Sequence, residues 1–284
     1  MSLGHDWFTE YATRIGTAFS LEIKRKLHEE QTRYQHLEIY ETEHYGNLMV
    51  LDGFIMLTQK DNFIYHEMMA HPALFSHAAP HNVVIVGGGD CGTLLEVMKH
   101  TVVKQAWQVE IDERVTRNAE KYFPELCASN SDPRARLIFD DGIAWIENAV
   151  PGSLDLIIVD STDPVGPAEG LFREPFYRAC YAALGDGGIL VQQSESPLVH
   201  AEKIIYPMRS AMSSAGFNDV QTLFFPLPVY PTGWWSATLA CKGNTLGFAR
   251  ENDAAVKRFP TRYYNTGIHK GAFAQPEFFG KDRG

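Results

Sequence analysis

The stretch Val83-Val84-Ile85-Val86-Gly87-Gly88-Gly89-Asp90-Cys91-Gly92 decides the fold of this 284-residue chain. Its β-branched residues predict a buried strand, and residues 93–99 continue as a helical stretch. Between the two, residues 87–92 satisfy the pattern G-x-G-x-x-G, whose glycines permit a tight turn and close approach of the backbone to a nucleotide. The stretch therefore predicts a nucleotide-binding turn. A plain tight turn is the alternative, because several classes of protein share the pattern.

Outward from this turn, strands and helices alternate along the chain. Strands are predicted at residues 82–86, 106–111, 135–139, 154–159, 188–192, 220–225 and 236–241. Helices are predicted at residues 93–99, up to 122, 175–183 and 200–215. This alternation is typical of an α/β fold, with a doubly wound, mostly parallel sheet covered on both faces. Such sheets bind ligands beyond the carboxyl ends of their strands, so the residues after each strand are the candidates for function.

The first sixty residues follow a different pattern. Residues 34–42, 46–51 and 54–58 alternate in the manner of strands, and Asp52-Gly53 is a strong signal for a hairpin turn. From Asp61, a plausible helix N-cap, the period becomes helical. We therefore predict two domains: a small antiparallel β domain over residues 1–60 and a doubly wound α/β domain over residues 61–284.

Composition excludes several classes of partner. The formal net charge is -10, so a nucleic-acid backbone would be repelled. The longest apolar runs are far too short to span a membrane, and the N-terminus has no signal-peptide pattern. The four cysteines have neither metal-ligand nor redox spacing and are predicted to be free thiols in a reducing compartment. We expect a soluble, cytoplasmic protein.

Two acidic residues indicate which nucleoside the turn holds. Glu110 ends the second strand, where an acid typically accepts hydrogen bonds from a ribose. Asp90 lies inside the glycine turn, where a carboxylate would repel a diphosphate by about 4 kcal/mol at a separation of about 4 Å and an effective dielectric constant of about 20. The sulfonium and amine of an S-adenosylmethionine-type ligand would instead be attracted. A simple helix N-cap is the alternative role for Asp90.

Further acids follow the third and fourth strands. Asp141-Gly142 is placed to reach an adenine amino group, although a turn or N-cap aspartate is the alternative. Asp160 and Asp163 follow the apolar residues 154–159 and, with Asp90 and Asp141, predict a strongly negative cleft. The loop that follows is stiff but irregular, which suits a lid, and contains Pro164, Gly166 and Pro167.

Such a cleft requires a cation. Zinc is disfavoured because a histidine or cysteine cluster is missing from the sequence pattern. Magnesium remains conceivable, but it usually accompanies phosphates, which Asp90 disfavours. An organic polyamine fits the acids better.

The sequence resembles the spermidine synthases from about residue 7 to residue 278. The motifs that carry the resemblance are Tyr65-His66-Glu67-Met68, residues 87–92, Glu110-Ile111-Asp112, Asp141-Gly142, Asp160-Ser161-Thr162-Asp163-Pro164, Gln193, Tyr230-Pro231-Thr232-Gly233 and Tyr263-Tyr264-Asn265. Each motif alone is moderately specific, but their order and spacing together are highly specific.

The resemblance implies transfer of an aminopropyl group from decarboxylated S-adenosylmethionine to putrescine, giving spermidine and 5′-methylthioadenosine. It also implies a homodimer, and it implies that residues 61–284 form a Rossmann-like, methyltransferase-type catalytic domain. No metal and no cofactor are expected, because decarboxylated S-adenosylmethionine is a co-substrate.

The resemblance also assigns site residues. For the donor it implies Gln35, His66, Gly87, Gly89, Asp90, Glu110, Asp141, Gly142 and Asp160. Within that set, Glu110 takes the ribose, Asp141 the adenine amine, and Asp90 with Gln35 and His66 the aminopropyl ammonium. For the acceptor channel it implies Trp7, Tyr65, Asp160, Asp163, Gln193 and Tyr230, with Glu195 nearby and Pro167 in the loop.

The chemistry separates the two acids of the segment. A protonated amine has no lone pair, and with a reference pKa near 10.4, freeing it at pH 7 costs about 4.6 kcal/mol. We therefore expect Asp160 to accept the proton as the new bond forms, acting as general base. Asp163 is expected to hold the acceptor. Several of these residues also have purely structural alternatives. Tyr65 and Trp7 could be core or interface aromatics, and His66 could be a structural histidine. Gln193 could pair a strand end, and Gln35 could face outward from a strand.

Rival functions stay open on the sequence. They are transfer to cadaverine, agmatine or spermidine, methylation of putrescine, an NAD-dependent oxidoreductase that Asp90 argues against, and a silent polyamine-binding protein. Two departures from the family pattern bear on the site: Cys91 stands where a glycine or alanine is usual, and Trp234-Trp235 is bulky.

Overall fold

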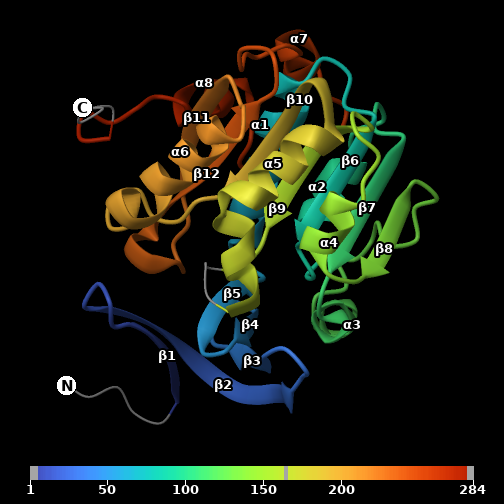
Figure 1. Cartoon of the computed structure of the whole chain (residues 1–284). Helices are drawn as coiled ribbons and strands as arrows, with labels where there is room; N and C mark the ends of the chain where they lie inside the picture. Colours follow the sequence, from blue (N-terminus) through green and yellow to red (C-terminus); the bar gives the residue numbers. More distant parts are fainter. Residues whose placement is uncertain (1–5, 163–165, 280–284) are drawn as a thin grey trace.

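The computed structural model describes residues 6–162 and 166–279 and contains two sheets. Figure 1 shows the small N-terminal sheet, in blue, below the larger sheet and its covering helices. The predicted α/β class with a small N-terminal antiparallel domain is confirmed. Within the described ranges, no helix combines the length and the apolar character that crossing a membrane requires.

The N-terminal sheet is an antiparallel meander in the order β1-β2-β3-β4-β5. Its strands are β1 (Trp7–Ala12), β2 (Thr17–Gln31), β3 (His36–Thr42), β4 (Asn47–Leu51) and β5 (Phe54–Thr58). The predicted hairpin turn at Asp52-Gly53 is present, with φ of 50° and 84°, as a two-residue turn of this type requires. Strands β1 and β2 had no counterpart in the sequence prediction.

The large sheet has the order β11-β12-β10-β9-β6-β7-β8. Its strands are β6 (Asn82–Gly87), β7 (Gln105–Glu110), β8 (Ala135–Phe139), β9 (Leu154–Asp160), β10 (Leu184–Gln193), β11 (Asp219–Pro226) and β12 (Trp234–Cys241). Strands β8, β7, β6, β9 and β10 pair in parallel, whereas β12 is antiparallel to both β10 and β11. The chain runs from β6 outward to β7 and later returns to β9 on the other side, so a cleft is expected at the carboxyl ends of β6 and β9.

Two hydrophobic cores cover the two faces of this sheet. Val83 and Ile85 belong to one core and Val84 and Val86 to the other, as the alternation of a strand requires. The helices are α1 (Asn62–Ser76), α2 (Gly92–Met98), α3 (Glu113–Tyr122), α4 (Gly142–Glu147), α5 (Glu174–Ala183), α6 (Tyr206–Ser214), α7 (Glu251–Ala255) and α8 (Thr266–Ala272). Short helical segments of other types are the 3-10 helices η1 (Gly166–Phe172) and η3 (Pro231–Gly233) and the π-helix η2 (Ala201–Ile205).

Two helix predictions need correction in detail. Asp61 stands at the N-cap of α1, but its side chain makes no cap bond and instead accepts from the Thr58 hydroxyl. The helix predicted over residues 200–215 is a π-helix followed by α6. Side-chain periodicity does not distinguish one widened turn from a regular one.

Glu67 joins two sequence motifs that lie far apart in the chain. Its buried carboxylate accepts the backbone N–H groups of Arg262 (2.7 Å), Tyr263 (2.9 Å) and Tyr264 (2.7 Å). We expect Glu67→Gln to lower the free energy of unfolding by about 2–3 kcal/mol in urea titrations, because an amide offers one acceptor oxygen in place of two. The matched control is Glu113→Gln, where an exposed ion pair with Arg117 predicts a loss below about 1 kcal/mol. Equal losses for the two variants would show that the three backbone contacts do not stabilise the fold.

Candidate active site

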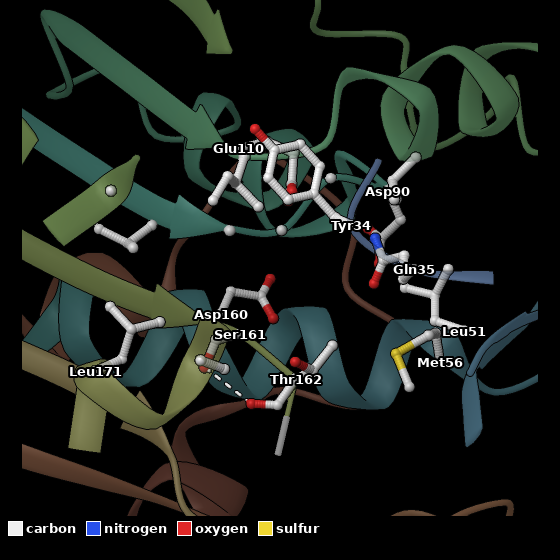
Figure 2. Close-up of a pocket in the computed structure, with 18 of the residues that line it drawn as sticks. Tyr34, Gln35, Leu51, Met56, Asp90, Glu110, Asp160, Ser161, Thr162 and Leu171 are labelled. Atoms are coloured by element: carbon white, nitrogen blue, oxygen red, sulfur yellow. Dashed lines mark hydrogen bonds between the residues drawn. The ribbon is translucent and has the colours of Figure 1, made fainter. Parts of the chain in front are cut away.

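A cavity of about 300 Å³ lies at the carboxyl ends of β6, β7 and β9, closed on one side by residues of β4 and β5. Figure 2 shows Asp160 near its centre, with Glu110 on one side and Gln35 and Asp90 on another. Ten of the residues predicted for the site line this cavity: Gln35, Tyr65, Gly87, Gly89, Asp90, Glu110, Asp141, Gly142, Asp160 and Tyr230. Residues far apart in sequence are therefore brought to one place, as the sheet topology predicts.

The glycine turn packs directly against the acids. Gly87 has a φ of 83°, and a Cβ there would lie 2.3 Å from the carbonyl oxygen of Asp160. A Cβ at Gly89 would lie 2.9 Å from Oε2 of Glu110. Only glycine permits this close approach, so the motif shapes the cavity floor.

Cys91 has a left-handed φ of 69°, a conformation that favours glycine. Its thiol is fully buried, contacts the Gly89 carbonyl at 3.6 Å and accepts from Nε2 of Gln108 at 3.5 Å. It is absent from the described cavity lining. The thiol therefore packs away from the cavity.

Asp160 ends β9 and is held by two hydroxyl groups. Tyr65 Oη donates to Oδ1 and Thr93 Oγ1 donates to Oδ2, each at 2.6 Å. Burial, together with the nearby charge of Asp90, raises the pKa of Asp160. Burial and the Asp160 charge raise the pKa of Tyr65 well above its usual range, so Tyr65 acts as a hydrogen-bond donor.

Asp90 pairs with His66, which is buried behind it on α1. Nε2 of His66 lies 3.2 Å from Oδ1 of Asp90. Burial favours the neutral ring, but the charges of Asp90 and Asp160 outweigh it and raise the pKa of His66. Oδ1 of Asp90 also accepts from the Gly92 amide at 2.7 Å. The side chain of Asp90 thus also contacts the start of α2, although the N-cap residue of that helix is Cys91.

Glu110 is a buried carboxylate beside the turn, and its Oε1 accepts the Asp112 amide at 2.8 Å. Burial, followed by the charges of Asp112, Asp160 and Asp90, raises the pKa of Glu110 to about 7. The side chain is therefore poised between its charged and neutral forms at neutral pH. Any ligand that needs its charged form will bind in a pH-dependent way.

We expect a nucleoside whose ribose hydroxyls donate to ionised Glu110, with 5′-methylthioadenosine as the test ligand, to bind more weakly as the pH falls below about 7, by up to about tenfold per pH unit. Above that pH the affinity should level off. Titration calorimetry from pH 5.5 to 8.5 measures this. Glu110→Gln should bind weakly at every pH and lose the slope. An unchanged slope in that variant would show that another group is responsible.

Asp141 and Gln35 both line the cavity. Asp141 is the N-cap of α4, and its Oδ1 accepts the Ile143 amide at 2.8 Å, so its alternative capping role is also observed. Gln35 is the last residue of the loop between β2 and β3, and its Nε2 donates to Oδ2 of Asp112 at 3.0 Å. The amide group is therefore oriented by an acid that sequence reasoning assigned no role.

Some of the residues predicted for the acceptor line the cavity and others do not. Tyr230 donates its hydroxyl to the Met56 carbonyl, and its ring lies 6.2 Å from that of Tyr65. Gln193 is buried behind Thr162 and donates to its carbonyl at 3.5 Å. Trp7 lies on β1 and, like Gln193, is not among the described residues that line the cavity.

The rest of the acidic segment is only partly described. Asp163 lies outside the described residues, and the backbone of Pro167 lies in η1. Glu195 has a left-handed φ of 67° and is buried, with Oε2 3.2 Å from Nδ1 of His200.

The bulky pair Trp234-Trp235 does not line the described cavity either. The Trp235 ring packs edge-on against Tyr230 at 4.7 Å and so supports the wall from behind.

Sequence reasoning missed several residues that complete the site. Thr93 and Asp112 hold Asp160 and Gln35, and an apolar wall is formed by Leu51, Met56, Ile143 and Leu171. Thr93 follows the glycine pattern directly, and that position is the only signal that could have found it.

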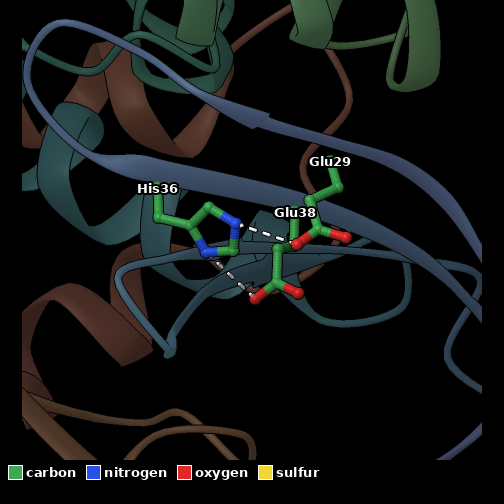
Figure 3. A group of neighbouring side chains, drawn as sticks. All are labelled: Glu29, His36 and Glu38. Atoms are coloured by element: carbon green, nitrogen blue, oxygen red, sulfur yellow. Dashed lines mark hydrogen bonds and ion pairs between the residues drawn. The ribbon is translucent and has the colours of Figure 1, made fainter.

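Among the described residues, one cluster has ligand atoms close enough for a metal: Glu29, His36 and Glu38 on β2 and β3. Figure 3 shows the imidazole between the two carboxylates, with a different ring nitrogen facing each. Lys26 Nζ lies 2.7 Å from an oxygen of each glutamate. The cluster is therefore an ion-pair network in which Lys26 supplies the cation.

Two family models and several known proteins match this chain. Residues 62–249 match the spermine/spermidine synthase domain, and residues 6–59 match the spermidine synthase tetramerisation domain. A polyamine aminopropyltransferase of Thioalkalivibrio sulfidiphilus is 63% identical over 281 residues, which cover 99% of each chain. One from Methylococcus capsulatus is 60% identical over 275 residues, covering 97% of this chain and 96% of the other.

Solved structures of spermidine synthases also match this chain. A spermidine synthase in complex with the transition-state analogue AdoDATO has a TM-score of 0.92 and 34% identity, covering 98% of this chain and 94% of the other. The spermidine synthase from Thermotoga maritima has a TM-score of 0.90 and 33% identity over the same shares. With a family domain over most of its length and relatives at 60% identity or above, this chain belongs to the spermine/spermidine synthase family.

Proposed function

We propose that the cavity binds decarboxylated S-adenosylmethionine and putrescine and that the chain transfers the aminopropyl group between them. Asp90, Glu110 and Asp160 converge on one cavity, and the described residues that line it include no lysine, arginine or histidine. Like charges gathered in this way are unfavourable until a cation neutralises them. A sulfonium donor with an ammonium tail and a diamine acceptor supply that charge. The products are spermidine and 5′-methylthioadenosine.

The donor occupies the side of the glycine turn. Glu110 accepts the ribose hydroxyls, and Asp141 with Gly142 meets the adenine amine. Asp90 takes the aminopropyl ammonium while His66 fixes the direction of its carboxylate. The Gln35 amide nitrogen is engaged by Asp112, so its carbonyl oxygen is the group that faces the ligand. Gly87 and Gly89 let the backbone approach.

The acceptor lies between Tyr65, Tyr230 and Asp160, with Trp7, Gln193 and Asp163 along the rest of its channel. Tyr65 and Tyr230 cover the methylene chain and direct the attacking nitrogen. Holding nitrogen and carbon in line supplies a large part of the acceleration.

Asp160 is the general base. The neutral acceptor nitrogen attacks the carbon next to the sulfonium, the C–S bond breaks as the N–C bond forms, and a neutral thioether leaves. The new nitrogen then carries a positive charge and, unlike the neutral amine, can give a proton to Asp160, whose raised pKa suits this step. A neutral leaving group needs no Lewis acid, so we propose that the reaction uses no metal and no cofactor.

We further propose that the chain works as a cytoplasmic homo-oligomer. The match of residues 6–59 to a tetramerisation domain supports assembly through the N-terminal sheet, with the homodimer as the minimal unit. The four cysteines are free, as a reducing compartment requires. The proposed domain boundary at residues 60 and 61 falls between the end of β5 at Thr58 and the start of α1 at Asn62.

An amine panel tests this function. The protein is incubated with decarboxylated S-adenosylmethionine, EDTA and putrescine, cadaverine, agmatine or spermidine, and release of 5′-methylthioadenosine is followed. We expect release to be fastest with putrescine. Faster turnover of another amine would overturn only the acceptor, whereas no release with any amine would overturn the transfer itself. Loss of activity in EDTA alone would overturn the metal-free mechanism.

A further inference from the structure

The carboxylate of Asp160 is held from two helices at once. Tyr65 reaches Oδ1 from α1 and lines the cavity, whereas Thr93 reaches Oδ2 from the first turn of α2. Thr93 is fully buried and does not line the described cavity. Its hydroxyl therefore acts on Asp160 from behind, out of reach of the substrates.

The carboxylate has little freedom around this bond. A Cβ at Gly88 would lie 2.9 Å from Oδ2 and 3.1 Å from the Ile85 side chain, so Oδ2 is packed against the glycine turn. A buried carboxylate oxygen that lost its donor would be left without compensation for desolvation. The Thr93 hydroxyl thus satisfies Oδ2, the oxygen of Asp160 that packs against the glycine turn.

The charged groups around Asp160 make the hydrogen bond from the Thr93 hydroxyl important. Asp90 on the turn disfavours a charge on Asp160, while His66 on α1 favours it. The charge of Asp160 in turn helps to raise the pKa of Glu110 on β7. Burial is the largest influence and raises the pKa of Asp160, and the hydroxyls of Thr93 and Tyr65 act in the opposite direction. Removing the Thr93 hydroxyl should therefore raise this pKa further.

We propose that Thr93 is a positioning residue for aminopropyl transfer: its hydroxyl fixes the orientation of Asp160 and keeps it ionised before the acceptor attacks. This inference rests on the proposed role of Asp160 as general base. It adds to that role a residue whose side chain touches neither substrate.

Thr93→Val removes the hydroxyl at nearly constant volume, and Thr93→Ser keeps it. At saturating substrates and pH 7.5, we expect Thr93→Val to lower kcat by about tenfold, with both KM values near those of the unaltered protein. The acidic limb of its kcat–pH profile should move to higher pH, so that the loss shrinks toward pH 9. Thr93→Ser should restore most of kcat, and the acidic limb of its profile should lie at the pH seen in the unaltered protein.

Binding of 5′-methylthioadenosine reports whether each variant is folded, and Thr93→Ala replaces Thr93→Val if the latter does not bind. A kcat–pH profile that superimposes on that of the unaltered protein overturns the inference. So do equal losses in Thr93→Val and Thr93→Ser with an unmoved limb, which would indicate packing alone. Asp160→Asn separates the role of Thr93 from the general-base role of Asp160. If Asp160→Asn is inactive while Thr93→Val is unaffected, only the role of Thr93 is wrong. If Asp160→Asn is active, the general-base role itself is wrong.

Discussion

Asp160→Asn should lower kcat by about 10²–10⁴-fold while changing the affinity for decarboxylated S-adenosylmethionine by only a few fold. Asparagine is isosteric and can still accept from Tyr65 and donate to Thr93, so the architecture around β9 is retained. What it loses is the ability to take a proton from the newly alkylated nitrogen. Steady-state kinetics with both substrates varied, and donor affinity by calorimetry, measure the two effects separately.

The matched control is Asp155→Asn, the same substitution at the other end of β9. Asp155 accepts the backbone amides of His81 and Asn82 and does not line the described cavity. Its variant should keep kcat within about twofold even if its stability falls. Unchanged turnover in Asp160→Asn, or equal losses in both variants, would contradict the general-base role.

Asp90→Asn should weaken binding of decarboxylated S-adenosylmethionine by about 100-fold, or about 2.7 kcal/mol, because a buried ammonium loses its carboxylate. The variant keeps an Oδ1 that accepts the Gly92 amide, so the start of α2 should be preserved. Calorimetric titration with the donor gives the loss directly.

A second ligand makes this result specific to charge. 5′-Methylthioadenosine has the same nucleoside but no ammonium, so its affinity for Asp90→Asn should stay within about threefold of the original. Equal weakening of both ligands would mean that Asp90 shapes only the glycine turn. The comparison therefore decides whether Asp90 binds the ammonium or only supports the glycine turn.

The parts of the fold that could be predicted are those written locally in the chain. The glycine turn after residues 83–86 and the Asp52-Gly53 hairpin are fixed by φ angles that few residue types adopt. Because acids directly after parallel strands must meet at one sheet edge, Asp90, Glu110, Asp141 and Asp160 could be grouped without a structure.

What could not be predicted depends on packing between distant segments. Sequence alone gives no reason for Thr93 to meet Asp160, or for Asp112 to hold Gln35, since those contacts join separate elements. The same holds for Trp7, whose position follows from the pairing of β1 with β2 at Glu22. Of the residues assigned only by family resemblance, Gln35, Tyr65 and Tyr230 line the cavity, whereas Trp7 and Gln193 are not among its described lining residues.

The most direct test of the central claim is the identity of the products. The unaltered protein is given putrescine with equal amounts of decarboxylated S-adenosylmethionine and S-adenosylmethionine, and the mixture is analysed by mass spectrometry. Aminopropyl transfer predicts spermidine and 5′-methylthioadenosine in a one-to-one ratio, formed from the decarboxylated donor alone. N-Methylputrescine with S-adenosylhomocysteine, or no new amine at all, would contradict it.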